Sequence, residues 1–259
     1  MNQPMFSIPR ISESFIEGIA ISLGWKRYLD IKEQIEGRAN ADFIAEGSII
    51  ELKILEEEGL EKAYRQDNLA SLFCHLSKNA TEVNIDFDSI PEEISHEAEK
   101  LIAKPIQKAV KKASKQIRCT REDMNLTQSK GILLIINNGY KYLTSDNFEY
   151  LVKKCALKDS SQIDFVYCVT VEYHQGEFDS FIFCITRCHF IGETKTWKYS
   201  DLIEKAIQSK FSESMSQMMK DQMNPEFWRS NLEPVSDIVF EREGVRYIRR
   251  APHVPDSRS

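Results

Sequence analysis

Polar and apolar residues alternate along two short neighbouring segments, residues 39–45 and 48–55, and this pattern predicts a β-hairpin. The turn between them centres on Gly47, a residue that adopts the positive φ that such turns need. Along the second segment the apolar side chains point to one face, and Glu51 and Lys53 point to the other. Burying a carboxylate and an ammonium on an apolar strand costs free energy, which suggests that the two groups serve a function there. We therefore expect the chain to be organised around this hairpin.

The remaining periodicity predicts alternating helices and strands. An uninterrupted apolar run over 131–136 is typical of a central strand that is buried on both faces. Residues 79–95 are polar, acidic and broken by a proline, so we expect a surface insertion there. Helices are expected over 11–23, 60–77, 98–119, 147–157 and 199–223, and further strands over 25–34, 162–173 and 178–189. We expect Pro105 to mark a helix start and Gly244 to lie in a last hairpin.

Composition excludes some classes of protein. The 259 residues carry a formal net charge of -6, which argues against a protein that coats nucleic acid indiscriminately. No apolar run approaches the roughly 20 residues that span a bilayer, and residues 1–5 lack the basic and apolar regions of a secretory signal. We therefore expect a cytoplasmic protein with no membrane partner. The six cysteines lie mostly among apolar neighbours, as in a reducing compartment.

The hairpin resembles a known nuclease family. Asp42, a turn, and Glu51-x-Lys53 within an apolar strand resemble the motif of the PD-(D/E)xK superfamily, with Ala41 where the name-giving proline usually stands. The resemblance covers about residues 11–140. It implies an α/β fold with a restriction-endonuclease-like core of helix, three strands, helix and strand, in which helices flank a mixed sheet. This core would occupy 1–140 with an insertion near 56–98, and 141–259 would be a C-terminal α+β extension packed on it.

The resemblance also implies a chemistry. Asp42, Glu51 and Lys53 are the expected catalytic residues, and Asp42 and Glu51 the expected ligands of Mg²⁺, with Mn²⁺ able to substitute. An acidic residue on the preceding helix often joins the metal in this family, and Glu17 is preferred here over Glu13. The alternative is that both glutamates belong to a solvated helix face. The expected reaction is hydrolysis of DNA phosphodiesters, with RNA left open, in a bacterial defence or restriction system.

The segment 98–119 predicts a helix with one apolar and one basic face. In an acidic protein, a basic face is a candidate site for phosphates, and the alternative is a solvated lysine face. We assign nucleic-acid binding to five residues of this helix: Lys104, Lys108, Lys111, Lys115 and Gln116. The family's core helix often presents a polar residue to the active site, and the resemblance implies that Lys115 and Gln116 lie at that position.

Two other hypotheses are weighed against an active nuclease. A zinc site at Cys184, Cys188 and His189 is disfavoured, because no second pair is spaced to complete four ligands. A catalytically inactive subunit of the same fold, used for binding or assembly, is favoured by the acidic charge and by the methionine-rich helix 199–223, which suits a homo-oligomer or partner contact through the C-terminal part. The joint presence of Asp42, Glu51 and Lys53 favours the active enzyme.

Overall fold

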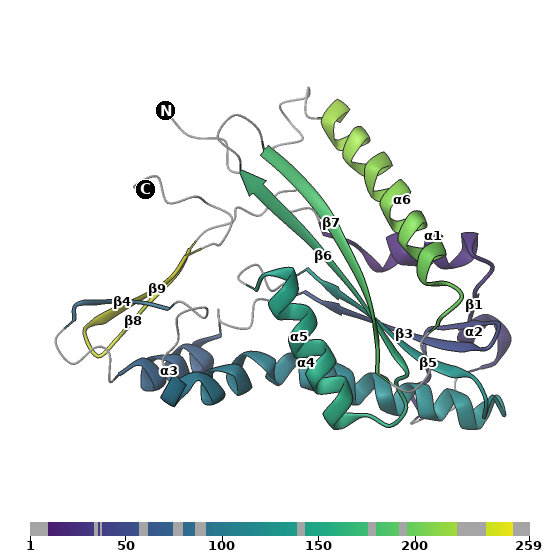
Figure 1. The fold of residues 1–259 in the computed structure, drawn as a ribbon, viewed down its shortest axis with the longest axis horizontal. Helices are drawn as coiled ribbons and strands as arrows, with labels where there is room; N and C mark the ends of the chain where they lie inside the picture. Colours follow the sequence, from purple (N-terminus) through teal and green to yellow (C-terminus); the bar gives the residue numbers. More distant parts are fainter. Residues whose placement is uncertain are drawn as a thin grey trace.

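A six-stranded mixed sheet with helices on both faces forms the centre of the protein (Figure 1). The structure is a computed structural model that describes residues 10–33, 36, 38–56, 62–74, 80–85, 92–138, 143–175, 180–191, 196–221 and 237–250. The α/β class and the mixed, helix-flanked sheet expected from the sequence are confirmed.

The sheet has the strand order β1-β2-β3-β5-β6-β7. The first three strands are antiparallel neighbours: β1 (Lys26–Arg27), β2 (Phe43–Ala45) and β3 (Ser48–Leu55). Next come β5 (Lys130–Asn137) and β6 (Phe165–Gln175), both parallel to β3, and then β7 (Ser180–Phe190), antiparallel at the edge. The apolar run of β5 lies between β3 and β6 and is buried, as its sequence predicts.

Different helices cover the two faces of the sheet. On one face, α1 (Glu13–Ser22) and α6 (Ser200–Asp221) enclose a cluster that includes Trp25 and Trp197. On the other face lie α4 (Glu92–Asp123) and α5 (Ser145–Asp159). The residues of β3 alternate between these two clusters, so Glu51 and Lys53 share the α4 side with Ile49.

A second sheet joins the insertion to the end of the chain. Its strand β4 (Glu82–Asn84) pairs in parallel with β9 (Val245–Arg249), which forms a hairpin with β8 (Ile238–Arg242). The short α2 (Tyr28–Ile31) follows β1, and α3 (Ala63–Phe73) packs under the small sheet. Thus the predicted insertion contributes a strand to a common core with the C-terminal hairpin. Beyond residue 140, β6 and β7 continue the main sheet and α5 packs on it.

Two expected boundaries are wrong. Helix α4 begins at Glu92 and contains Pro105 in its interior, because Ala98 and Ile102, which precede the proline, are buried and outweigh one missing backbone hydrogen bond. The strand expected over 25–34 is only Lys26–Arg27, and the chain then turns into α2. Within the part of the chain that the structure describes, no helix is long and apolar enough to cross a membrane.

Candidate active site

The register of the β2–β3 hairpin sets Asp42 opposite Glu51. Phe43 pairs with Ile50. Asp42 precedes Phe43 and Glu51 follows Ile50, so these two residues face each other on the α4 side of the sheet. Asp42 Oδ2 also accepts the backbone N–H of Leu52 at 2.7 Å, which fixes the position of this carboxylate beside β3. The hairpin therefore brings the two acidic residues of the motif together.

Lys53 completes the cluster. Its ammonium donates to Oε1 of Glu51 and, at 3.2 Å, to the carbonyl oxygen of Leu52. Glu51 has 0% of its surface exposed, and its second oxygen, Oε2, is buried with no hydrogen-bond partner among the described residues. A buried carboxylate oxygen without a partner is costly, so this position favours the arrival of a cation or a donor.

Burial changes the acidity of Glu51. Desolvation is the largest cause that raises the pKa of this carboxyl, the Asp42 carboxylate also raises it, and Lys53 opposes both effects, so that the pKa is about 8. A buried carboxyl beside a second acidic group resists ionisation unless positive charge is supplied. The electrostatics therefore favour binding of a second positive charge besides Lys53.

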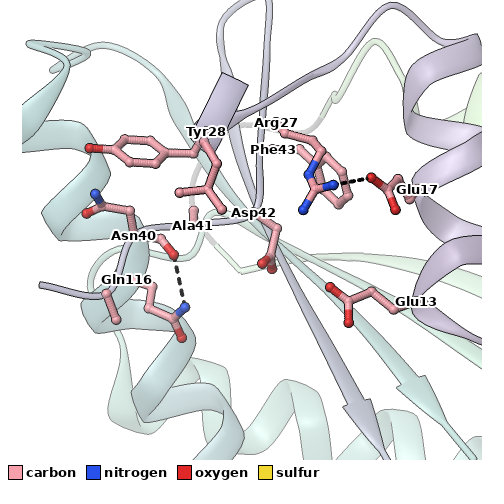
Figure 2. A pocket seen from close by; sticks show the side chains of 11 residues that line it. Glu13, Glu17, Arg27, Tyr28, Asn40, Ala41, Asp42, Phe43 and Gln116 are labelled. Carbon is pink, nitrogen blue, oxygen red and sulfur yellow. Dashed lines mark hydrogen bonds and ion pairs between the residues drawn. The ribbon is translucent and has the colours of Figure 1, made fainter. Parts of the chain in front are cut away.

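A pocket of about 210 Å³ lies in front of Asp42 (Figure 2). Asn40 and Gln116 line it beside Asp42. Gln116 Nε2 donates to the backbone carbonyl of Asn40 at 3.0 Å, whereas the amide oxygen Oε1 is buried without a partner among the described residues. Thus Gln116, which the sequence assigned to nucleic-acid binding, lies in the same pocket as Asp42, while Glu51 is buried outside the pocket lining.

Helix α1 contributes two glutamates to this pocket. Glu17, the residue preferred from the sequence, forms an ion pair with Arg27 of β1. Glu13, one turn earlier, is exposed and points into the pocket toward Asp42 (Figure 2). Both side chains therefore lie at the site, and Glu13 rather than Glu17 has its carboxylate uncommitted to an ion pair among the described residues.

Sequence reasoning missed the groups that hold the hairpin in place. Thr120 of α4 is fully buried, and its hydroxyl accepts the backbone N–H of Ala41 at 2.7 Å. Asn40 is also buried, and its backbone carbonyl accepts the side-chain amide of Gln116 of α4. Asn40 is close to Asp42 in the sequence and could have been flagged for that reason, but nothing in the sequence connects residue 120 with residue 41.

The predicted lysine face is exposed and lies outside the pocket lining. With about 100° of rotation per residue, it lies opposite the side of α4 that packs on the sheet. Lys111 is also paired with Asp159 of α5 at 3.4 Å. The other three lysines of this set have no ion-pair partner among the described residues: Lys104, Lys108 and Lys115.

The donors at the hairpin fit a metal ion only in part. Among the described residues no three His, Cys, Asp or Glu side chains form a metal-binding group. Two carboxylates, Asp42 and Glu51, and the carbonyl of Leu52 offer hard oxygen donors, the type that Mg²⁺ prefers. The ammonium of Lys53 contacts Glu51 and that carbonyl, which shows that these oxygens accept a positive charge. The disfavoured zinc residues Cys184 and Cys188 lie on β7 as free cysteines.

Comparisons with protein-family models, with curated proteins and with solved structures find no match to this chain.

Proposed function

We propose that this protein is a Mg²⁺-dependent nuclease, with Mn²⁺ as a substitute, that hydrolyses phosphodiester bonds of DNA. The observation that carries the proposal is the pairing of Asp42 with a buried Glu51 that has an unpartnered oxygen, with Lys53 bound to the same carboxylate. The order of α1, β1 to β3, α4 and β5 supports a PD-(D/E)xK core, because helix, three strands, helix and strand is the order that the resemblance implies; the short α2 follows β1, and α3 and β4 lie within the insertion.

The residues of the site divide into holding and positioning roles. Asp42, Glu51 and the carbonyl of Leu52 would hold the metal, which when bound supplies an acidified water and charge neutralisation at the phosphate. Lys53, freed from Glu51 by that competing charge, would donate to the attacking water or to the non-bridging oxygens, where negative charge grows in the transition state. Gln116 Oε1 is a free acceptor for the same water.

The proposal includes the biological setting expected from the sequence. The substrate is DNA, with RNA as the alternative polymer, and the enzyme acts in the cytoplasm as part of a bacterial defence or restriction system. The helix α6 and the C-terminal hairpin offer the surface for a homo-oligomer or partner subunit.

A second candidate function is a catalytically inactive subunit of the same fold. The observation in its favour is that Lys53 occupies the Glu51 carboxylate and that Glu51 does not reach the pocket. In such a protein the Lys53–Glu51 pair would be a permanent internal ion pair, and nucleic acid would bind without being cut.

Cleavage of plasmid, linear duplex and single-stranded DNA separates the two candidates. The assay compares Mg²⁺, Mn²⁺ and EDTA, with Asp42→Asn as the site variant and the distant Glu46→Gln, an exposed glutamate at the hairpin turn, as the matched control. We expect cleavage that requires metal and Asp42 but not Glu46. Wild-type protein that binds DNA and leaves it intact with either metal contradicts the nuclease proposal and supports the inactive subunit.

A further inference from the structure

One row of polar side chains on α4 connects the candidate active site with a distant groove. Residues four apart form a ridge along a helix surface, and one such ridge begins at Gln116 in the pocket. It continues toward the N-terminus of α4 through Lys112, Lys108 and Lys104, all three exposed. Each step advances about 6 Å along the axis, so the ridge extends about 18 Å from Gln116 to Lys104 and turns gradually from the pocket side to the outer face.

The lysines of this ridge are available for a ligand. Lys112, Lys108 and Lys104 have no ion-pair partner among the described residues. The lysines on the far flank differ, because Lys111 is paired with Asp159 at 3.4 Å. A row of unpaired ammonium groups beside a pocket favours a polyanion that extends in one direction from that pocket.

The far end of the ridge opens into a groove between α3 and α4. The groove has a volume of about 390 Å³, and Tyr64, Arg65, Asn68 and Lys104 are among the residues that line it. Tyr64 is 52% exposed, and the guanidinium of Arg65 lies 5.8 Å from the centre of its ring while Arg65 Nε donates to its hydroxyl at 3.1 Å. Lys104 lines the same groove as Tyr64, so the far end of the ridge and this ring share one site.

We propose that an unpaired nucleic-acid strand leaves the candidate active site along the ridge Lys112, Lys108 and Lys104 and stacks a base on Tyr64 in the α3–α4 groove. Lysines that track a backbone toward an exposed aromatic ring are the combination that binds single strands, because every unpaired base offers a face for stacking. In a duplex the bases are stacked inside the double helix, so none is available to stack on Tyr64. The preferred substrate is therefore a tailed duplex or a single strand. This inference rests on the proposed function for the position of the bond that is cut.

The test measures binding in EDTA, so that it does not depend on cleavage. Labelled single strands, a blunt duplex and the same duplex with a single-stranded tail, as DNA and as RNA, are titrated at several salt concentrations. The ridge leaves out two lysines that the sequence assigned to nucleic-acid binding, Lys111 and Lys115. The ridge variant Lys104→Gln/Lys108→Gln/Lys112→Gln is therefore compared with Lys111→Gln/Lys115→Gln, which removes charge from the same helix off the ridge. Tyr64→Ala is compared with Tyr64→Phe, which keeps the ring.

We expect the ridge variant to lose on the order of tenfold in affinity for single-stranded and tailed probes, with the log–log salt slope reduced by about 0.7 per lost contact, so by about 2. The off-ridge variant should keep the wild-type slope. Tyr64→Ala should lose on the order of tenfold on the same probes, Tyr64→Phe should not, and neither should change binding of the blunt duplex.

Equal losses for the two lysine variants, or unchanged tailed-probe binding by Tyr64→Ala, overturn the inference. Its failure can be told apart from failure of the nuclease proposal. If the protein cuts DNA but the ridge variants bind normally, only the nuclease proposal holds. If the protein binds through the ridge but does not cut, only the inference holds, and the ridge is a binding site.

Discussion

Asp42 and Glu51 face each other across the β2–β3 hairpin, one at the edge of an open pocket and the other fully buried. The burial of Glu51 opposes its ionisation, and Lys53 compensates for part of the charge. Such an arrangement costs stability, since a neutral side chain at position 51 would avoid burying a charge. The first predictions follow from this relationship.

Replacing Glu51 with Gln should stabilise the metal-free protein at pH 8. The pKa of Glu51 is raised from 4.5 to about 8 in the folded state, so the unfolded chain releases the proton first as the pH rises. The free energy of unfolding of the wild type should therefore fall between about pH 4.5 and 8, by roughly 4 kcal/mol at most. Urea unfolding at pH 5 and pH 8 checks this, and Glu51→Gln should lose that part of the slope. If the unfolding free energy of Glu51→Gln depends on pH as steeply as that of the wild type, Glu51 is not the source of the pH dependence.

Mg²⁺ and Mn²⁺ should raise the melting temperature of the wild type. A metal that binds only the folded protein stabilises it in proportion to RT ln(1 + [L]/Kd), and the ligand carboxylate must first lose its proton. The metal-induced shift should therefore be larger at pH 8 than at pH 6, and absent in Asp42→Asn. Thermal scans with each metal and with EDTA measure it. The same shift in Asp42→Asn would place the metal elsewhere.

Lys53→Ala should reduce cleavage by about 10²-fold to 10³-fold, the cost of removing one donor to a charged transition state. DNA binding should remain, because the lysine acts on the transition state more than on the bound substrate. The variant also removes the partner of Glu51, so its stability should decline more steeply than that of the wild type as the pH rises toward 8. Single-turnover cleavage and anisotropy titrations separate the two effects. Wild-type cleavage by Lys53→Ala removes Lys53 from the mechanism.

Glu13→Gln should weaken the metal-induced shift more than Glu17→Gln does. The carboxylate of Glu13 points into the pocket toward Asp42, whereas that of Glu17 is held by Arg27 (Figure 2). The two residues lie one turn apart on α1, so each variant is the matched control of the other. Melting curves in a Mg²⁺ titration give the comparison. A larger effect of Glu17→Gln would restore the preference drawn from the sequence.

The sequence predicts the parts of the fold that local chemistry determines. The β2–β3 hairpin follows from alternation around Gly47, whose φ of +70° needs glycine, and β5 follows from its unbroken apolar run. The parallel pairing of β4 with β9 joins residues such as Val83 and Tyr247, far apart in the chain, and no local pattern reports it. The interior position of Pro105 depends likewise on tertiary burial before the proline.

The candidate site divides in the same way. The hairpin places Asp42, Glu51 and Lys53 together through strand periodicity alone, so the sequence is enough to group them. The choice between Glu13 and Glu17 depends on Arg27, which lies on β1 and pairs with Glu17. This tertiary contact between α1 and β1 cannot be read from the local sequence of α1.

Thr120→Val tests whether α4 positions the β2–β3 hairpin of the candidate site. The buried hydroxyl of Thr120 accepts the N–H of Ala41, and valine of nearly equal shape leaves that N–H without a partner. We expect a loss of about 1–3 kcal/mol in unfolding free energy. Because Ala41 precedes Asp42, the metal-induced melting shift should also fall, which a purely structural role would leave unchanged. Thr120→Ser keeps the hydroxyl and should restore both quantities. A Thr120→Val protein that is destabilised yet binds Mg²⁺ as tightly as the wild type would show that β3, through the Leu52 N–H, positions Asp42 without help from α4.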